Sequence, residues 1–375
     1  MPIIFTYEKL YKAYLSCRKN KRKTINALDF ELDFEKKLRD LLRELKSRKY
    51  IPGRSICFAV EKPKVREIFA ADFRDRIVHH LFVNEIIEYA QRRFIYDSYA
   101  CLKNKGTLKA VKRLQHFIKQ EAHFSKGELW YLKMDVASFF VSIDKNILFE
   151  ILGTFINRLK RRREWKGEMM WLGRIIIFHR CQDNYVTKGD LNLLASIPHE
   201  KSMFGQLAGK GLPIGNYTSQ FFANLYMNEL DYFIKRSMKI KKYLRYVDDV
   251  VVISENIEKL RTLPMVIDNF LRERLALKLS KKKTIIQPVK RGIEFLGYFI
   301  KPTHTLVKNN VVSRLKNKLR NGMIDAETMP LVNSYFGYFS HAQSLSLRKS
   351  ICDKLSDKFG YADDCRKINL VSQSS

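Results

Sequence analysis

Hydrophobic and polar residues alternate along this chain with two different periods. A period of about 3.6 residues, typical of helices with one apolar face, covers residues 5–50, 72–90, a stretch ending near 121, 145–179 and 256–279. Short runs rich in β-branched and aromatic residues predict strands within 55–69, 129–135 and 242–254, from 281 onward, and at 292–300. Residues 180–210 follow neither period and are expected to be irregular. This order of helices and strands predicts an α/β protein.

Two details of this pattern concern packing. In the first helical stretch, leucines recur on what we expect to be one apolar face, at Leu28, Leu32, Leu38, Leu41, Leu42 and Leu45. The segment Lys301-Pro302-Thr303 is the predicted boundary between a domain of residues 1–300 and a basic, mostly helical unit of residues 301–375. That unit is too small for us to expect it to fold alone.

The apolar run from Lys242 to Ser254 is interrupted by two adjacent aspartates, Asp248 and Asp249. Two strands joined by a tight turn are the simplest prediction. Aspartate is disfavoured in strands, and neighbouring carboxylates repel each other at pH 7. The turn therefore needs either full exposure to water or a bound cation, and these residues alone leave both interpretations open.

A third carboxylate follows another apolar run, because the predicted strand from Leu129 to Met134 ends on Asp135. If it points toward a cleft, Asp135 supplies the acidic ligand that the Asp248-Asp249 turn lacks. Three aspartates on two β elements match what phosphoryl transfer to a 3′ hydroxyl requires, since two Mg²⁺ ions about 4 Å apart must be held by hard oxygen ligands. Mn²⁺ is the alternative ion.

Charge and aromatic content favour a polyanionic partner. The chain has 70 Lys and Arg against 39 Asp and Glu, a formal net charge of +31, and the excess is spread along its whole length. Its 25 Phe and 18 Tyr could stack on bases beside those cations. The six cysteines are dispersed, which indicates neither a disulfide scaffold nor a zinc site. Apolar runs are too short to cross a bilayer, so we expect a cytoplasmic protein without a membrane partner.

The order of these segments resembles the reverse transcriptases. Asp135 to Ser142 resembles their first palm motif, Gly211 to Gln220 the second, and Tyr246 to Asp249 the YxDD box. Lys283-Thr284 and Phe295 to Tyr298 resemble the two motifs that follow. Each short motif alone is weak, but all lie in the family's order, which makes the match specific. The resemblance implies a right-hand polymerase, with fingers and an α+β palm in residues 1–300 and a helical thumb and tail in residues 301–375.

The resemblance also implies roles for single residues. Metal binding would fall to Asp135, Asp248, Asp249 and the carbonyl of Val136. Lys64 and Arg66, which stand with Lys62 on the hairpin predicted within 55–69, would hold the incoming triphosphate, although such cations can equally line a solvated edge. Lys283 would protonate the pyrophosphate leaving group.

Phe140, five positions after Asp135, matches the bulky residue that blocks a 2′ hydroxyl in this family. An aromatic side chain there would favour deoxynucleotides over ribonucleotides. The alternative is an ordinary core phenylalanine, an interpretation that suits Phe139 better than Phe140.

Within the family, the second palm motif is most similar to that of diversity-generating retroelements. Most group II intron-like members carry Gln-Gly and Ser-Pro where this chain carries Ile214-Gly215 and Ser219-Gln220. Ile214, Gly215 and Gln220 would border the incoming nucleotide. Replacing Gln by Ile removes a hydrogen-bonding side chain there, so we expect reduced fidelity. Reverse transcriptases of antiphage defence systems share the palm motifs and are an open alternative.

The implied partners are an RNA template with a DNA primer or an RNA–DNA duplex, dNTPs, a structured non-coding RNA and, for the diversity-generating type, a small oligomeric accessory protein. Two other functions compete with reverse transcription. A catalytically silent nucleic-acid-binding protein would need only the +31 charge. RNA-dependent RNA synthesis is disfavoured by Phe140.

Overall fold

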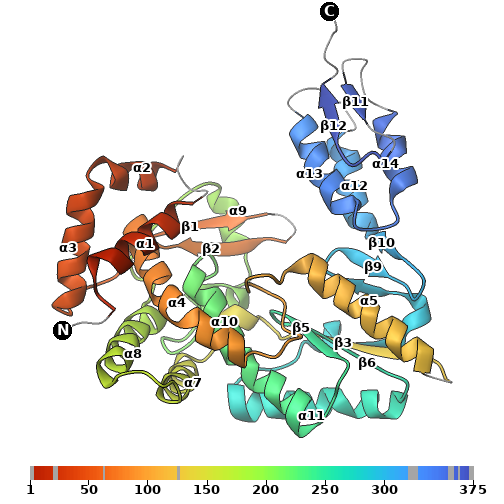
Figure 1. Ribbon diagram of the computed structural model, residues 1–375, viewed down its shortest axis with the longest axis horizontal. Helices are drawn as coiled ribbons and strands as arrows, with labels where there is room; N and C mark the ends of the chain where they lie inside the picture. Colours follow the sequence, from red (N-terminus) through yellow and green to blue (C-terminus); the bar gives the residue numbers. More distant parts are fainter. Residues whose placement is uncertain are drawn as a thin grey trace, which may run out of the picture.

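The computed structural model describes residues 4–19, 24–61, 64–124, 127–319, 328–353, 359–361 and 364–370. Lys62, expected beside Lys64 and Arg66, lies outside these ranges. The N-terminal half begins with α1 (Tyr7–Arg18), α2 (Ile25–Leu32) and α3 (Phe34–Lys46), followed by the predicted hairpin of β1 (Ser55–Val60) and β2 (Arg66–Ala70) and by α4 (Phe73–Arg93) (Figure 1).

The leucine face predicted for residues 28–45 is only partly correct. Leu38, Leu41 and Leu45 are buried on α3, at the spacing of one helical face. Leu28 and Leu32 are exposed. The helix is interrupted at Asp33, so α2 and α3 are separate helices whose apolar faces do not continue into each other. The face is therefore not continuous, and α2 packs through Ala27 and Phe30 instead.

Residues 180–210, expected to be irregular, contain a strand, a short α-helix and two 3-10 helices, His199–Lys201 and Met203–Gly205. β4 (Tyr185–Thr187) adds to β1 as a parallel strand, and α9 (Leu191–Ala195) begins at Asp190, whose side chain accepts hydrogen bonds from the backbone amides of Asn192 and Leu193. The prediction was wrong because β4 is short and exposed. β4 forms because it pairs with β1, which is distant in sequence, and not because its own residues form an apolar run.

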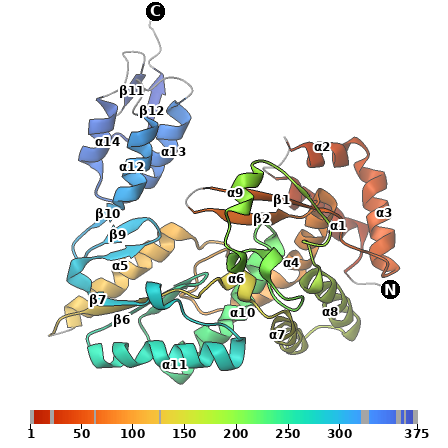
Figure 2. The same cartoon turned by 180° about the vertical axis from the view of Figure 1, so that it is seen from behind.

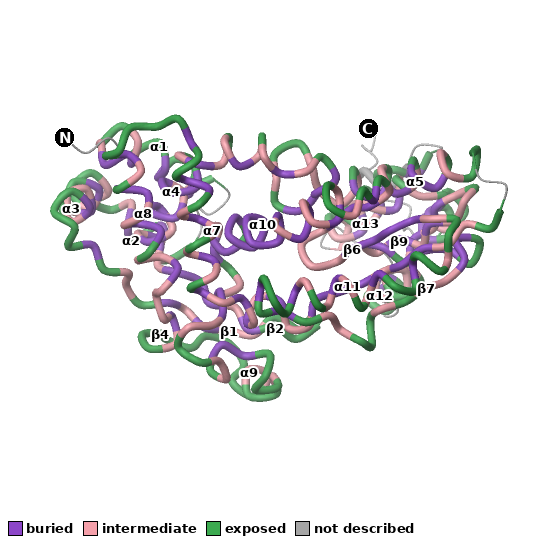
Figure 3. Tube along the Cα trace, turned by 90° about the horizontal axis from the view of Figure 1, so that it is seen from below, coloured by how far each residue is buried: buried purple, intermediate pink, exposed green. Residues whose placement is uncertain are grey.

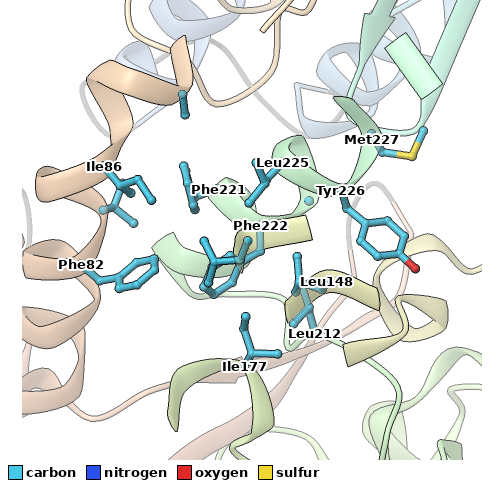
Figure 4. Packing of buried hydrophobic residues seen from close by; sticks show 14 of the residues in the cluster. Phe82, Ile86, Leu148, Ile177, Leu212, Phe221, Phe222, Leu225, Tyr226 and Met227 are labelled. Atoms are coloured by element: carbon cyan, nitrogen blue, oxygen red, sulfur yellow. The ribbon is translucent and has the colours of Figure 1, made fainter. Parts of the chain in front are cut away.

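The centre of the larger domain is α10 (Tyr217–Tyr232), whose residues are buried on nearly every side (Figure 3). Around it pack α4, α7 (Lys145–Asn157) and α8 (Arg163–Phe178). Figure 4 shows Phe221 and Phe222 of α10 between Phe82 of α4, Leu148 of α7 and Ile177 of α8. Because α10 is buried on nearly every side, it holds in place the segments that precede and follow it in the chain. The segment that follows it leads into the hairpin with Asp248 and Asp249.

That hairpin belongs to a four-stranded antiparallel sheet in the order β5-β6-β3-β7. Its strands are β5 (Tyr243–Tyr246), β6 (Asp249–Ser254), β3 (Trp130–Met134) and β7 (Ile285–Pro288). α5 (Thr107–Phe124) covers one face and α11 (Ile257–Leu275) the other (Figure 2). Both faces are thus buried, as the nearly continuous apolar strands predict. β7 starts only at Ile285, because the expected start at Lys281 is a short 3-10 helix.

Residues 292–300, expected to be one strand, form a hairpin of β8 (Ile293–Phe295) and β9 (Tyr298–Ile300). Leu296 and Gly297 both have positive φ, 49° and 85°, which is the signature of a two-residue hairpin turn. β10 (Thr305–Val307) pairs with β9, so this sheet continues past Lys301-Pro302-Thr303. The division at residue 300 stays a prediction.

The C-terminal part contains α12 (Asn309–Lys318), α13 (Met329–Phe339) and α14 (Leu345–Cys352), with β11 (Phe359–Tyr361) paired to β12 (Ile368–Leu370). It has a hydrophobic core of its own and lies beyond β9 and β10, away from the N-terminal helices (Figure 1). The six cysteines are free thiols. No helix in the described ranges is both long and apolar enough to cross a membrane.

Candidate active site

The three predicted aspartates meet at one end of the four-stranded sheet. Met134 of β3 pairs with Val250 of β6, and the chain continues from Met134 directly into Asp135. Asp249 precedes Val250 on the neighbouring strand, so Asp135 and the Asp248-Asp249 turn lie at the same edge. The side chains that the sequence predicts to act together are therefore brought together by strand register.

The turn before the two aspartates has an unfavourable backbone conformation. Val247 has a φ of 57°, in the left-handed region, where a β-branched residue is rare. Such a conformation costs of order 1–3 kcal/mol and persists only where the surroundings impose it. Here Arg245 Nη1 donates a hydrogen bond to the Val247 carbonyl at 2.8 Å. The side chain of Arg245 on β5 thus stabilises the conformation of the turn.

Arg245 is fully buried and lies at the centre of a polar network. Its guanidinium donates to both carboxylate oxygens of Asp231 on α10, and further to Ser98 Oγ at 3.1 Å and Asn224 Oδ1 at 3.3 Å. A buried arginine with a bidentate carboxylate partner is a strong, directional anchor. The network ties the turn to α10 and to the segment before α5.

Lysines neutralise two of the three carboxylates. Lys283 forms an ion pair with Asp135, and Lys133 Nζ lies 3.8 Å from Asp249 Oδ1. Burial raises the pKa of Asp248 and that of Asp249, although nearby cations act in the opposite direction. Within the part of the chain that the structure describes, no group of three or more His, Cys, Asp or Glu side chains is arranged as a metal site.

The donor chemistry nevertheless suits Mg²⁺, since carboxylate oxygens are the ligands this ion prefers. Val136, expected to offer its carbonyl, is buried and bridges to Leu279 across from it. Next to it, the amide of Ser280 donates to the Asp135 carbonyl at 2.8 Å. These bonds fix the backbone around Asp135.

The hairpin of β1 and β2 brings its cations to the same place. Arg66 and Lys64 are exposed, and both lie close enough to Asp248 to oppose the rise of its pKa, Arg66 more strongly. Burial and the charges of Lys64, Lys133 and Arg66 lower the pKa of Lys283. The predicted triphosphate-binding cations and the predicted metal-binding carboxylates are thus electrostatic neighbours.

Phe139 is more deeply buried than Phe140, as expected if Phe139 is the core residue of the two. Phe139 is buried in the main core, whereas Phe140 is half-buried at its edge. Both belong to α6 (Phe139–Ser142), which follows Ser138 at a φ of 46°. That left-handed residue turns the chain between Asp135 and α6, and the Phe140 ring packs against the Phe139 ring.

The second predicted motif connects this turn to the hairpin. Leu212 donates its amide to the Phe140 carbonyl at 2.8 Å, and Phe69 of β2 donates to the Ile214 carbonyl at 2.9 Å. Gly215 has a φ of 124°, and a Cβ there would lie 2.9 Å from Ile68 Cγ2, so the position requires glycine. Ile214 is half-buried, and Gln220 is exposed in the first turn of α10.

Comparison with known proteins identifies the family. The family model described as "Reverse transcriptase (RNA-dependent DNA polymerase)" matches residues 59–300, well over half of the chain. This chain belongs to the reverse transcriptase family. A COX1/OXI3 intron 2 protein of Saccharomyces cerevisiae is 20% identical over 303 residues, covering 65% of this chain and 32% of the yeast protein. The chain thus spans about a third of that relative's length.

Solved structures support the reverse transcriptase fold. The apo telomerase from Candida tropicalis matches with a TM-score of 0.50 and 14% identity, covering 80% of this chain and 55% of the telomerase. The same telomerase truncated from its C-terminal domain matches with a TM-score of 0.50 and 12% identity, covering 68% and 55%. The expected α/β right-hand polymerase fold is therefore confirmed.

Sequence reasoning missed several residues that shape this reverse transcriptase's site. Arg245 and Asp231 stand within apolar segments, and a charged residue in such a segment is a signal for a buried ion pair. Lys133 interrupts the run of β3 in the same way. Glu67 is buried on β2 and accepts hydrogen bonds from Ser202 Oγ at 2.6 Å and the Met203 amide at 2.7 Å. It attaches the 180–210 segment to the β1–β2 hairpin, which no local pattern indicates.

Proposed function

We propose that this reverse transcriptase is an RNA-directed DNA polymerase that copies an RNA template into cDNA by two-metal-ion nucleotidyl transfer. One observation carries the proposal: Asp135 and the Asp248-Asp249 turn lie at one edge of the palm sheet, electrostatically coupled to Lys64 and Arg66 of the fingers. A silent binding protein would have no need for carboxylates that carry a burial cost at this edge.

The proposed reaction divides the labour among these residues. Asp135, Asp248, Asp249 and the Val136 carbonyl would hold two Mg²⁺ or Mn²⁺ ions, which supply Lewis acidity for attack by the primer 3′ hydroxyl and for charge on the triphosphate. Arg66 and Lys64 grip the triphosphate oxygens, Arg66 with its bidentate fork. Lys283, whose ammonium pairs with Asp135, donates a proton to the pyrophosphate leaving group. Phe140 lies against the sugar and excludes a 2′ hydroxyl.

A primer-extension assay tests this proposal. With Mg²⁺, dNTPs and a primed RNA template, the wild type should extend the primer and Asp248→Ala should lose incorporation by at least a hundred-fold, while both bind the duplex with similar affinity. Asp29→Ala removes an exposed carboxylate on α2 and is the matched control. A wild type that binds the duplex but adds no nucleotide would contradict the proposal and favour the silent binding protein.

For the biological role, we propose a diversity-generating retroelement with reduced fidelity, acting with a structured non-coding RNA and a small oligomeric accessory protein. Ile214 supports this proposal, because Ile214-Gly215 resembles the pattern of the diversity-generating type, whereas most group II intron-like members carry Gln-Gly there. The neighbouring genes provide the test. An accessory gene with template and variable repeats would support the proposal, whereas a cluster of antiphage genes would favour the defence alternative.

A further inference from the structure

The turn that joins α7 to α8 concentrates positive charge. Residues 158–166 contain six cations and a single acid, a net charge of +5 over nine positions, compared with +31 over all 375 residues. Five of these cations lie within six consecutive positions, and all five are exposed: Arg158, Lys160, Arg161, Arg162 and Arg163. We call these five residues the basic turn. Four of them are arginines, whose planar guanidinium matches the geometry of a phosphate group.

The backbone of the basic turn is held in a fixed shape. Leu159 is buried in the main core, and Trp165 is fully buried in the first turn of α8. Lys166 Nζ closes the turn by donating to the Asn157 carbonyl at 2.8 Å. Arg161 lies over the Trp165 ring, 4.9 Å from its centroid. The cations are therefore presented from a fixed frame, unlike those of a flexible basic tail.

The basic turn lacks the carboxylate partners that other cations of the N-terminal half have. On α3, Lys37, Arg39 and Arg43 each form an ion pair with an acidic side chain. Among the residues that the structure describes, no such pair involves a member of the basic turn. Like charges this close repel one another, and an anion that lies across them would relieve the repulsion.

A hollow and two further arginines extend this surface. The hollow has a volume of about 250 Å³ and is lined by Lys160, Arg161, Arg162 and Trp165. At the end of α4, Arg93 lies over the Phe155 ring of α7, 5.6 Å from its centroid, and its neighbour Arg92 is exposed. Cations from two segments of the chain therefore contribute to one basic surface.

This surface is separate from the candidate active site. The start of α7 lies beside the second motif, because the Gly211 amide donates to the Ile143 carbonyl at 2.8 Å. α7 is 13 residues long, so the basic turn at its other end lies about 20 Å away. α7 and α8 also lie on the other side of α10 from the four-stranded sheet that carries Asp249 (Figure 1 and Figure 2).

The side chains around the basic turn indicate which polyanion fits. Within residues 145–178, all of which the structure describes, no large apolar side chain is exposed. Stacking on unpaired bases needs exposed aromatic rings, and insertion into a membrane surface needs exposed apolar side chains. A row of phosphates, as a nucleic-acid duplex presents it, needs only well-placed cations.

We propose that the basic turn, together with Arg92 and Arg93, is a docking surface for the phosphate backbone of duplex RNA. A structured RNA then stays bound through its duplex segments while a single-stranded part is copied at the aspartates. The choice of RNA as the occupant rests on the proposed function, whereas the docking surface itself does not.

The first test reverses one charge without weakening the helix. Arg163 is the first residue of α8, where the helix dipole favours an acidic side chain, so Arg163→Glu should fold as stably as the wild type. Lys36→Glu, the matched control, makes the same charge change in the first turn of α3. In anisotropy with a fluorescent RNA hairpin, Arg163→Glu should bind about five-fold more weakly and Lys36→Glu like the wild type. Melting curves compare the stability of the three proteins.

The second test measures salt dependence. A variant with Lys160→Gln, Arg162→Gln and Arg163→Gln loses three cations but keeps Arg161 on the Trp165 ring. The slope of log affinity against log salt should become shallower by about 2, since each lost phosphate contact contributes about 0.7–0.9 to the slope. Primer extension on a short primed template should proceed at the wild-type rate, because that duplex is held at the aspartates.

Three results would overturn the inference. One is an unchanged RNA affinity and salt slope in the triple variant, and another is an equal loss of RNA affinity in Arg163→Glu and Lys36→Glu. The third is a loss confined to a DNA hairpin of the same sequence or to vesicles of anionic lipid, because the occupant would then be DNA or a membrane. A wild type that binds the RNA hairpin but extends no primer would defeat the proposed function alone, since anisotropy measures docking without catalysis.

Discussion

Arg245 and Asp231 form a fully buried bidentate ion pair, with Nε to Oδ1 at 2.8 Å and Nη2 to Oδ2 at 2.6 Å. Tyr243 adds a hydrogen bond to the same carboxylate at 2.6 Å. Since Arg245 also holds the strained Val247 turn, the pair supports the backbone that carries Asp248. The edge that carries the candidate metal ligands thus depends on a fully buried charge pair.

The first prediction concerns this pair. Asp231→Asn keeps the side-chain shape but leaves a buried guanidinium without its counter-charge, so the free energy of unfolding should fall by about 3–5 kcal/mol. Urea denaturation followed by circular dichroism measures the change. Glu258→Gln, which disrupts the exposed pair with Arg261, is the control and should cost under about 0.5 kcal/mol. Similar losses in the two variants would contradict the assigned importance of the buried pair.

The second prediction is a pH dependence of stability from Lys145. This side chain is fully buried at the start of α7, donates to the His179 carbonyl at 3.2 Å, and burial lowers its pKa to about 8. Unfolding restores an ordinary pKa of 10.5. Below pH 8 the folded protein bears the full cost of a buried charge, and above pH 10.5 it bears none, because the amine is neutral in both states.

Wild-type stability relative to Lys145→Met should therefore rise by roughly 3 kcal/mol between pH 7 and pH 10.5. Denaturant unfolding of both proteins across this range measures the difference, and the subtraction removes other groups that titrate there. A difference that stays flat with pH would show that Lys145 keeps an ordinary pKa in the folded state.

The third prediction concerns sugar selection. Phe140→Ala should increase ribonucleotide incorporation relative to deoxynucleotide incorporation by at least ten-fold, because the half-buried ring no longer blocks a 2′ hydroxyl. Single-nucleotide kcat/KM values for dNTP and rNTP give the ratio. Phe149→Ala, which removes a half-buried ring that packs on Phe178, serves as the control and should leave the ratio unchanged. If the ratio of ribonucleotide to deoxynucleotide incorporation is unchanged in Phe140→Ala, the proposal that Phe140 blocks a 2′ hydroxyl is wrong.

The fourth prediction concerns fidelity. Ile214→Gln should lower the misincorporation frequency several-fold, since the amide adds a hydrogen-bonding check beside the incoming nucleotide. Sequencing of cDNA copied from a defined RNA measures the error spectrum. Ile285→Gln makes the same change at a more exposed site on β7 and should leave the spectrum as it is. If Ile214→Gln also leaves the error spectrum unchanged, the proposal that Ile214 reduces fidelity is wrong.

Local sequence was enough to predict the elements that carry the candidate site residues. The Lys242–Ser254 hairpin, the strand ending at Asp135 and the 55–69 hairpin all form as expected. Their apolar periods and turn residues act over a few positions, so they can be read without knowing the fold. The order of these motifs also indicated the family, which the match over residues 59–300 confirms.

Only the tertiary structure decided what lies between these elements. Three side-chain contacts join residues up to 116 positions apart in the chain. They are the ion pair of Arg245 with Asp231, the ion pair of Lys133 with Asp249 and the hydrogen bond from Tyr338 to the Leu296 carbonyl. The exposure of Leu28 and Leu32 and the pairing of β4 with β1 were decided in the same way. Such contacts depend on which faces the packed elements present to one another, a property that local periodicity does not encode. The sequence by itself predicted the three aspartates as candidate metal ligands, and the packing of distant segments determined which side chains support the backbone around them.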